Sequence, residues 1–130
     1  MYRALTDDIR ITVEPHFIEA QSNPIKSRFM WAYTVEIANL GVQSVQLVSR
    51  NWRIIDADGN IEDVNGEGVV GEKPMIAPSA TFIYTSGCPL KTPSGMMSGS
   101  YIMIWDDGTA FEAQIPAFAL LSPFSRLAKH

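Results

Sequence analysis

Hydrophobic and polar residues alternate with a period of two along most of the chain. Between Trp31 and Ala38 the odd positions hold aromatic or aliphatic side chains, and the even positions hold small or polar ones. Alternation of this kind predicts a β-strand with one buried face. Comparable runs fall at residues 9–14, 42–56, 60–64, 81–86 and 99–118. No segment repeats apolar residues at helical spacing over three turns, so the pattern predicts an all-β protein.

Turn signals separate these runs. Asp58-Gly59 and Asp107-Gly108 each join two alternating segments, which predicts two β-hairpins. Turn signals recur at roughly 8–12 residues, the spacing typical of an antiparallel sandwich with about seven strands. The lone Cys88 excludes the intersheet disulfide of antibody domains, so we expect an immunoglobulin-like sandwich of the fibronectin type III-like kind. The aromatic core candidates are Trp31, Tyr33, Trp52, Phe82, Tyr101 and Phe111.

The 130 residues fit one domain of common size, and no linker or internal repeat divides them. We expect a single domain over residues 1–125 and a frayed C-terminal tail at 126–130. A formal net charge of −4 gives no general attraction to nucleic acid or to anionic membranes, so neither is expected as a partner.

No apolar stretch approaches the roughly 18 residues of a membrane span, and acidic residues stand near the N-terminus where a signal peptide would be apolar. An unpaired cysteine agrees with a reducing compartment. These observations favour a soluble, cytoplasmic protein.

The segment from Asn65 to Pro74 reads NGEGVVGEKP and contains a GxGxxG spacing. Two prolines close behind it leave no room for the helix that a dinucleotide fingerprint requires. Glycines between strands can instead form a nest of amides that binds pyrophosphate weakly, or can simply turn the chain between sheets. The anion-binding candidates are Gly66, Gly68, Gly71, Arg50 and Lys73.

The segment from Thr85 to Gly99 is rich in proline, glycine and hydroxyl side chains, which predicts a long loop, and loops of this length are often functional. We expect it to form a partner-binding surface. The alternative is a rigid cap in which Pro89, Leu90, Pro93 and Met97 fold onto the core. The partner-binding candidates are Ser86, Gly87, Pro89, Leu90, Thr92 and Pro93.

Neither catalysis nor metal binding is indicated by the sequence. Cys88 has no neighbouring histidine to activate it, so a structural role is expected. Asp56, Asp58 and Asn60 match the first ligands of a calcium loop, but Ile61 replaces the required glycine, and a hairpin turn explains the acids. No metal and no cofactor is expected. The only oxygen ligands considered are Asp56, Asp58, Asp106 and Asp107.

Several motifs together resemble the bacterial ApaG family. They are Ser49-Arg50-x-Trp52, the glycine segment from Gly66 to Pro74, the run from Thr85 to Tyr101 that begins TSGCPLKTPSG, and the stretches AYTVEIANLG, VQLVSR and AQIPAFAL. The resemblance covers about residues 5–122. Two positions depart from the usual pattern: Ser79 stands where glycine is common, and Trp105 lies in a hairpin arm that is often more acidic.

The resemblance implies a fibronectin III-like sandwich with no established enzymatic activity. It also implies an indirect link to cobalt resistance and magnesium efflux. Eukaryotic members attached to F-box and DNA-polymerase-interacting proteins point to protein binding. We therefore expect a non-catalytic interaction module, monomeric or weakly dimeric, with an unidentified protein partner. The alternative is a sensor that binds pyrophosphate or a nucleotide polyphosphate at the segment Gly66–Gly71.

Overall fold

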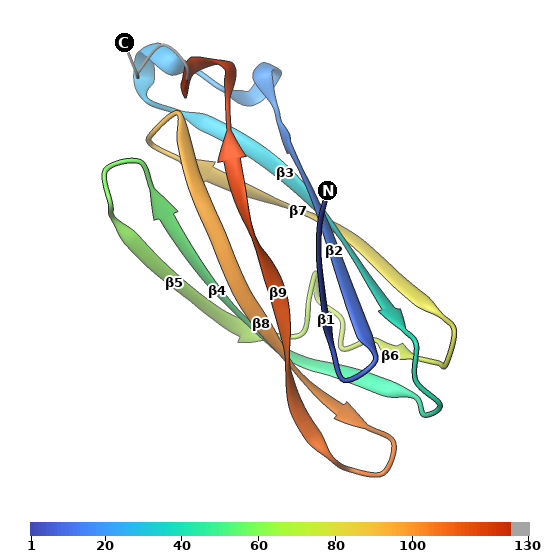
Figure 1. Cartoon of the computed structure of the whole chain (residues 1–130). Coiled ribbons are helices and arrows are strands. Elements are labelled where there is room, and N and C mark those ends of the chain that lie inside the picture. The colour runs from blue at the N-terminus through green and yellow to red at the C-terminus, as the bar shows by residue number, and fades with distance from the viewer. Residues whose placement is uncertain (126–130) are drawn as a thin grey trace.

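The computed structural model describes residues 1–125, which form two antiparallel β-sheets packed face to face (Figure 1). The tail expected at residues 126–130 lies outside the described residues. This is the predicted immunoglobulin-like, fibronectin III-like sandwich, although the strands in the described part number nine where about seven were expected. Within residues 1–125, no helix has the length and apolarity needed to cross a membrane.

The elements follow one another in the order β1 (Tyr2–Thr6), β2 (Ile9–Phe17), η1 (Glu19–Gln21), η2 (Pro24–Lys26), β3 (Phe29–Asn39), β4 (Val45–Asp56), β5 (Ile61–Glu67), β6 (Met75–Ile76), β7 (Thr81–Leu90), β8 (Ser94–Trp105) and β9 (Ala110–Leu121). One sheet has the strand order β1-β2-β3-β7. The other has the order β5-β4-β8-β9, with β6 also paired to β4. β1 and β6 were not predicted, and both are short, with five and two residues.

The core lies between the two sheets and is largely the one predicted. Of the six aromatic candidates, Trp31, Tyr33, Trp52 and Tyr101 are buried, whereas Phe82 and Phe111 are partly buried at its margin. Phe118, which was not a candidate, is fully buried, and its ring lies 6.0 Å from that of Trp52 at nearly a right angle. Each such large side chain contributes about 1.5–3 kcal/mol through burial.

Both predicted hairpins are confirmed, and their turns share the same hydrogen-bond pattern. In each, a glycine with a φ near +90° donates its N–H to the carbonyl at the end of the preceding strand: Gly59 to Asp56 and Gly108 to Trp105. Asp56 pairs with the start of β8 and Trp105 is its end, so the two tips lie at opposite ends of the sandwich (Figure 1). The four aspartates considered as metal ligands therefore cannot share one ion.

The prediction of a long loop from Thr85 to Gly99 is wrong, because this segment is a β-hairpin. β7 continues to Leu90 and β8 begins at Ser94, so the turn holds residues 91–93 only. Proline is tolerated in β7 because this strand is at a sheet edge, where one side of the backbone has no strand partner. Gly99 lets β8 approach β4 closely, since a Cβ there would lie 2.1 Å from the carbonyl oxygen of Asn51.

Candidate functional site

A cleft of about 270 Å³ is lined by residues of both β5 and β7, the strands that end the two sheets. β3 and β8 also contribute to its lining, at Tyr33 and Met97. The cleft joins two sets of candidates that the sequence analysis treated separately, the anion-binding set and the partner-binding set. It is lined by Tyr33, Arg50, Trp52, Ile54, Glu62, Val64, Ser86, Gly87, Cys88, Pro89 and Met97.

Arg50 on β4 is the cation of this cleft. Its Nη1 donates hydrogen bonds to the carbonyl oxygens of Glu67 at 2.9 Å and Gly68 at 2.8 Å. The guanidinium covers Gly66, where a Cβ would lie 2.6 Å from Nη2. Among residues 1–125 the ion pairs within 4.0 Å are Arg53–Asp63 and Lys73–Glu67, so no carboxylate of the described chain pairs with Arg50.

The glycine segment is a compact loop whose amides bond to β4 and to the segment's own backbone. The amide of Gly68 donates to Val48, and the amide of Val69 donates to Glu72, each at 2.8 Å. Two of the four amides from Gly68 to Gly71 are thus already bonded to backbone carbonyls. The carbonyls of the loop, rather than its amides, face Arg50. The arrangement matches the corner-turning role that was the alternative to an anion nest.

The partner-binding set is divided by the fold. Ser86, Gly87 and Pro89 line the cleft, and Leu90 lines an adjoining hollow. Thr92 is buried in the hairpin turn, where its hydroxyl donates to the Ser94 carbonyl and accepts from the amide of residue 57.

Pro93 belongs to the same turn, and its carbonyl accepts hydrogen bonds from both the amide and the hydroxyl of Ser122. Lys73, from the anion-binding set, does not line the cleft but pairs with Glu67 at 3.7 Å.

Tyrosines form a polar layer beneath the cleft that the sequence analysis did not identify. The hydroxyls of Tyr84 and Tyr101 share a buried hydrogen bond, and burial raises the pKa of both phenols. Burial also raises the pKa of the Cys88 thiol to about 11, and the nearby charge of Glu62 adds to that effect. A thiol with this pKa stays protonated near neutral pH, which fits the structural role expected for Cys88.

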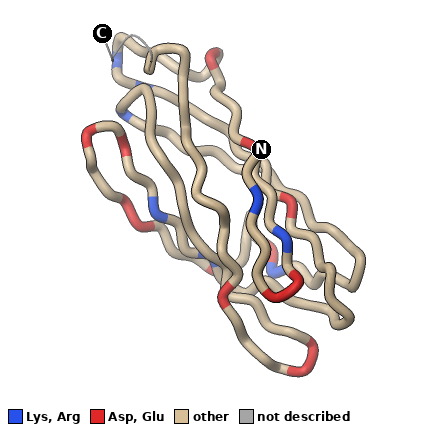
Figure 2. The backbone as a smooth tube through the Cα atoms, viewed as in Figure 1, with Lys and Arg blue, Asp and Glu red and all other residues tan. Residues whose placement is uncertain are grey.

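The free edge of β7 is uncharged along its whole length of ten residues (Figure 2). Its pairing with β3 runs without a bulge from Thr81 to Leu90. Side chains alternate strictly between an inner face and an exposed outer face. The exposed residues are Thr81, Ile83, Thr85, Gly87 and Pro89.

The other three sheet edges are protected more fully than that of β7, whose one protecting feature is Pro89. β5 has seven residues and carries Glu62, Asp63 and Glu67. β9 contains Pro116, and its amides at Gln114 and Ala119 donate to side chains of β1. β1 itself is only five residues long. Charge, proline and covering by another strand are the usual protections of edge strands.

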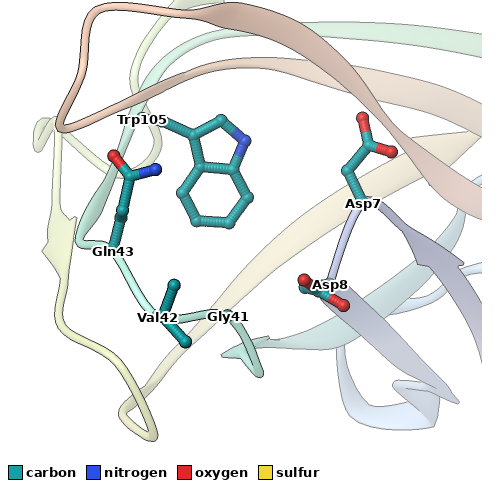
Figure 3. Close-up of a pocket in the computed structure, with 6 residues that line it drawn as sticks. All are labelled: Asp7, Asp8, Gly41, Val42, Gln43 and Trp105. Atoms are coloured by element: carbon teal, nitrogen blue, oxygen red, sulfur yellow. The ribbon is translucent and has the colours of Figure 1, made fainter.

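A second hollow lies at one end of the sandwich, between the β1–β2 turn and the β8–β9 hairpin (Figure 3). Its aromatic wall is Trp105, which stacks on Phe111 with 5.2 Å between ring centroids and lies against Gly41. Asp7 and Asp8 face this hollow from the turn. Trp105, one of the two departures from the family pattern, is thus part of a surface hollow.

No group of three or more His, Cys, Asp or Glu side chains lies close enough to hold a metal ion within residues 1–125.

Comparison with known proteins gives consistent matches. A family model described as the ApaG domain matches residues 19–105. Protein ApaG of Beijerinckia indica subsp. indica is 56% identical over 126 residues, 97% of each chain, and Protein ApaG of Methylorubrum extorquens (strain PA1) is 55% identical over 130 residues, 100% of each. The crystal structure of an ApaA protein from Bordetella pertussis is similar with a TM-score of 0.87 and 43% identity, covering 89% of this chain and 94% of that one.

Proposed function

The chain belongs to the ApaG family, and from this premise we propose that it is a non-catalytic, cytoplasmic protein-interaction module that binds its partner by strand addition at the edge of β7. The observation that carries the proposal is the uncharged, unbulged, ten-residue edge of β7. Such an edge presents backbone donors and acceptors that another chain can pair with, except at Pro89, which has no N–H. Because the other three edges are better protected, β7 is the edge at which a partner strand would add.

The neighbouring cleft supports the same proposal. In strand addition, main-chain hydrogen bonds supply affinity and pockets for alternate side chains supply specificity. The inner face of β7 borders the cleft through Ser86 and Cys88, so a partner strand on β7 would place alternate side chains at the cleft mouth. Each new backbone hydrogen bond contributes about 0.5–1.5 kcal/mol net, which favours a reversible complex.

We propose that the link to cobalt resistance and magnesium efflux, implied by the family resemblance, is indirect. In this view a partner bound at β7 handles the cations. The free thiol of Cys88 agrees with action in a reducing compartment such as the cytoplasm.

Site-specific photo-crosslinking tests the binding surface. A photoreactive residue at Ile83 on the outer face of β7 is compared with the same residue at Asp63 on β5, in cells that express the protein at its native level. We expect partner adducts from position 83 and none from position 63. The adducts should disappear when Thr85→Lys adds a charge to the same face of β7. Adducts from both positions, or adducts insensitive to Thr85→Lys, would refute strand addition at β7.

The second candidate function is recognition of pyrophosphate or a nucleotide polyphosphate at Gly66–Gly71. It is favoured by one observation: the Arg50 guanidinium lies beside Gly66 and has no carboxylate partner among residues 1–125. An amide NMR titration with pyrophosphate, ATP, diadenosine tetraphosphate, magnesium and cobalt, each added separately, tests it. Saturable shifts confined to Gly66–Gly71 support the sensor, and a protein indifferent to all five at millimolar concentration excludes it.

A further inference from the structure

We infer that the partner strand carries an acidic side chain opposite Ser86 and a basic side chain opposite Cys88. The inference rests on the proposed strand addition at β7 and specifies the chemistry of the segment that would bind there. It follows from which way β7 side chains face, and from the positions of two charges in the cleft.

Strand geometry fixes where the partner's side chains would go. Residues directly opposite each other on neighbouring strands point to the same face of the sheet. Ser86 and Cys88 lie on the inner face of β7 and line the cleft. Partner residues opposite these two positions would therefore point toward the cleft, while their neighbours would point outward to solvent.

Arg50 and Ser86 both line the cleft and both act on the Tyr33 phenol. Tyr33 pairs directly with Ser86 across β3 and β7, and Tyr33 and Arg50 line the same cleft. Burial raises the pKa of the Tyr33 phenol, and the Ser86 hydroxyl and the Arg50 charge partly offset that rise, as their proximity requires. The guanidinium of Arg50 bonds to carbonyl oxygens without a carboxylate partner in the described chain. A carboxylate entering here would form charge-assisted hydrogen bonds with it.

Glu62 lies farther along the cleft, level with Cys88 to Leu90. It pairs with Ile54, which is four positions beyond Arg50 on β4. Glu62 lines both the cleft beside Cys88 and the adjoining hollow beside Leu90. Lys91 also lines that hollow but is not within ion-pair distance of Glu62. A basic side chain opposite Cys88 would meet the negative charge of Glu62.

The two β7 positions assigned to opposite charges lie on one face of the strand. Ser86 and Cys88 are two residues apart, which is the period at which side chains return to the same face. Antiparallel pairing is the more stable arrangement per residue. In that direction the partner sequence reads basic, any residue, acidic, with the acidic residue opposite Ser86.

Synthetic nonapeptides test this order of charges without altering the protein. The probe peptide TVTKTETVT places Val, Lys, Glu and Val on the face that meets Leu90, Cys88, Ser86 and Tyr84. The reference peptide TVTTTTTVT has the same net charge and no ionic side chains. Binding is followed by amide shifts of the isotope-labelled protein at low salt. We expect the probe to bind about fivefold or more tightly than the reference, with both shifting amides of β7.

A charge change in the cleft provides the matched protein variant. Glu62→Lys should remove the advantage of the probe peptide over the reference, because the basic residue then meets a like charge. Glu112→Lys makes the same change on β9, away from the cleft, and should leave the advantage intact. A third peptide, TVTTTETVT, tests the Arg50 side alone and should keep part of the advantage.

The outcomes separate this inference from the proposed function. If both peptides shift β7 and bind equally, or if Glu62→Lys and Glu112→Lys act alike, the charge order is overturned while strand addition stands. If neither peptide shifts β7 at millimolar concentration, strand addition itself fails and the inference fails with it.

Discussion

β5 and β7 border the same cleft, but they differ in how well their free edges are protected from pairing with another strand. β5 carries Glu62, Asp63 and Glu67, and Asp63 is held in a two-pronged ion pair by Arg53. β5 also leads into the glycine loop, whose amides bond to β4 and to the loop's own backbone. β7 carries no charge and has no bulge.

We propose that this difference separates stability from recognition in this sandwich. An edge that serves only the fold is protected from stray pairing, as β5 is. An edge left open from Thr81 to Cys88, with a proline only at position 89, is a liability unless a partner uses it. Changes near β5 should therefore alter stability, and changes on the outer face of β7 should alter binding.

The largest effect is expected from Gly68→Ala, at the end of β5. Gly68 has a φ of 61°, and a Cβ there would lie 2.1 Å from the Glu72 carbonyl oxygen. We expect a loss of about 2–4 kcal/mol in the free energy of unfolding. Gly71→Ala is the control, since Gly71 also has positive φ but open space, and it should cost about 1 kcal/mol. Equal losses measured by urea denaturation would mean that the loop is not rigid.

Alkaline pH should destabilise the protein because the buried thiol of Cys88, on the inner face of β7, resists losing its proton. The pKa of the Cys88 thiol is raised from 9.0 to about 11, so the native state keeps a proton that the unfolded chain releases between these values. Stability is therefore unaffected below pH 9 and falls as pH rises toward 11, by up to about 1.4 kcal/mol per pH unit for each such group.

Tyr84 and Tyr101, whose pKa values are also raised, extend the loss to higher pH. Cys88→Ala should reduce the slope of unfolding free energy against pH between 9 and 11. An unchanged slope in this variant would show that the thiol does not contribute.

Ile83→Lys makes the outer face of β7 resemble a protected edge. Ile83 is 55% exposed, so the substitution should change unfolding free energy by less than about 0.5 kcal/mol. Affinity for the reference peptide TVTTTTTVT should fall about tenfold, because the charge opposes pairing on this face. Unchanged affinity, with the fold intact by circular dichroism, would argue against β7 as the binding edge.

The smallest effect is expected from making β5 resemble β7. The double substitution Glu62→Thr and Asp63→Thr removes two charges from that edge. Weak self-association should increase about twofold, as measured by sedimentation velocity. Strong dimerisation of the unmodified protein through β5 would contradict the claim that β5 is the protected edge and β7 the open one.

Alternation and turn chemistry predicted most of the fold, because both are local properties. Asp58-Gly59 and Asp107-Gly108 formed the expected hairpins, and the face holding Tyr33 became core. For the hairpin of β7 and β8 the sequence predicts a loop, since glycine and proline are disfavoured inside strands. They are tolerated there because of edge position and close strand approach, which depend on tertiary pairing.

The candidate site was predicted only in pieces for the same reason. Arg50 was correctly placed beside the glycine segment, which follows from its pairing with Gly66. The cleft itself needs Ser86 and Glu62 on strands that end different sheets, and no local pattern reveals which strands are edges.

Amide hydrogen exchange with and without bound TVTKTETVT tests the central claim most directly. Strand addition predicts slower exchange at those amides of residues 81–90 that do not bond to β3, with residues 61–67 unchanged. Protection along 61–67 or 66–71, with 81–90 unaffected, would contradict the claim that β7 is the binding edge.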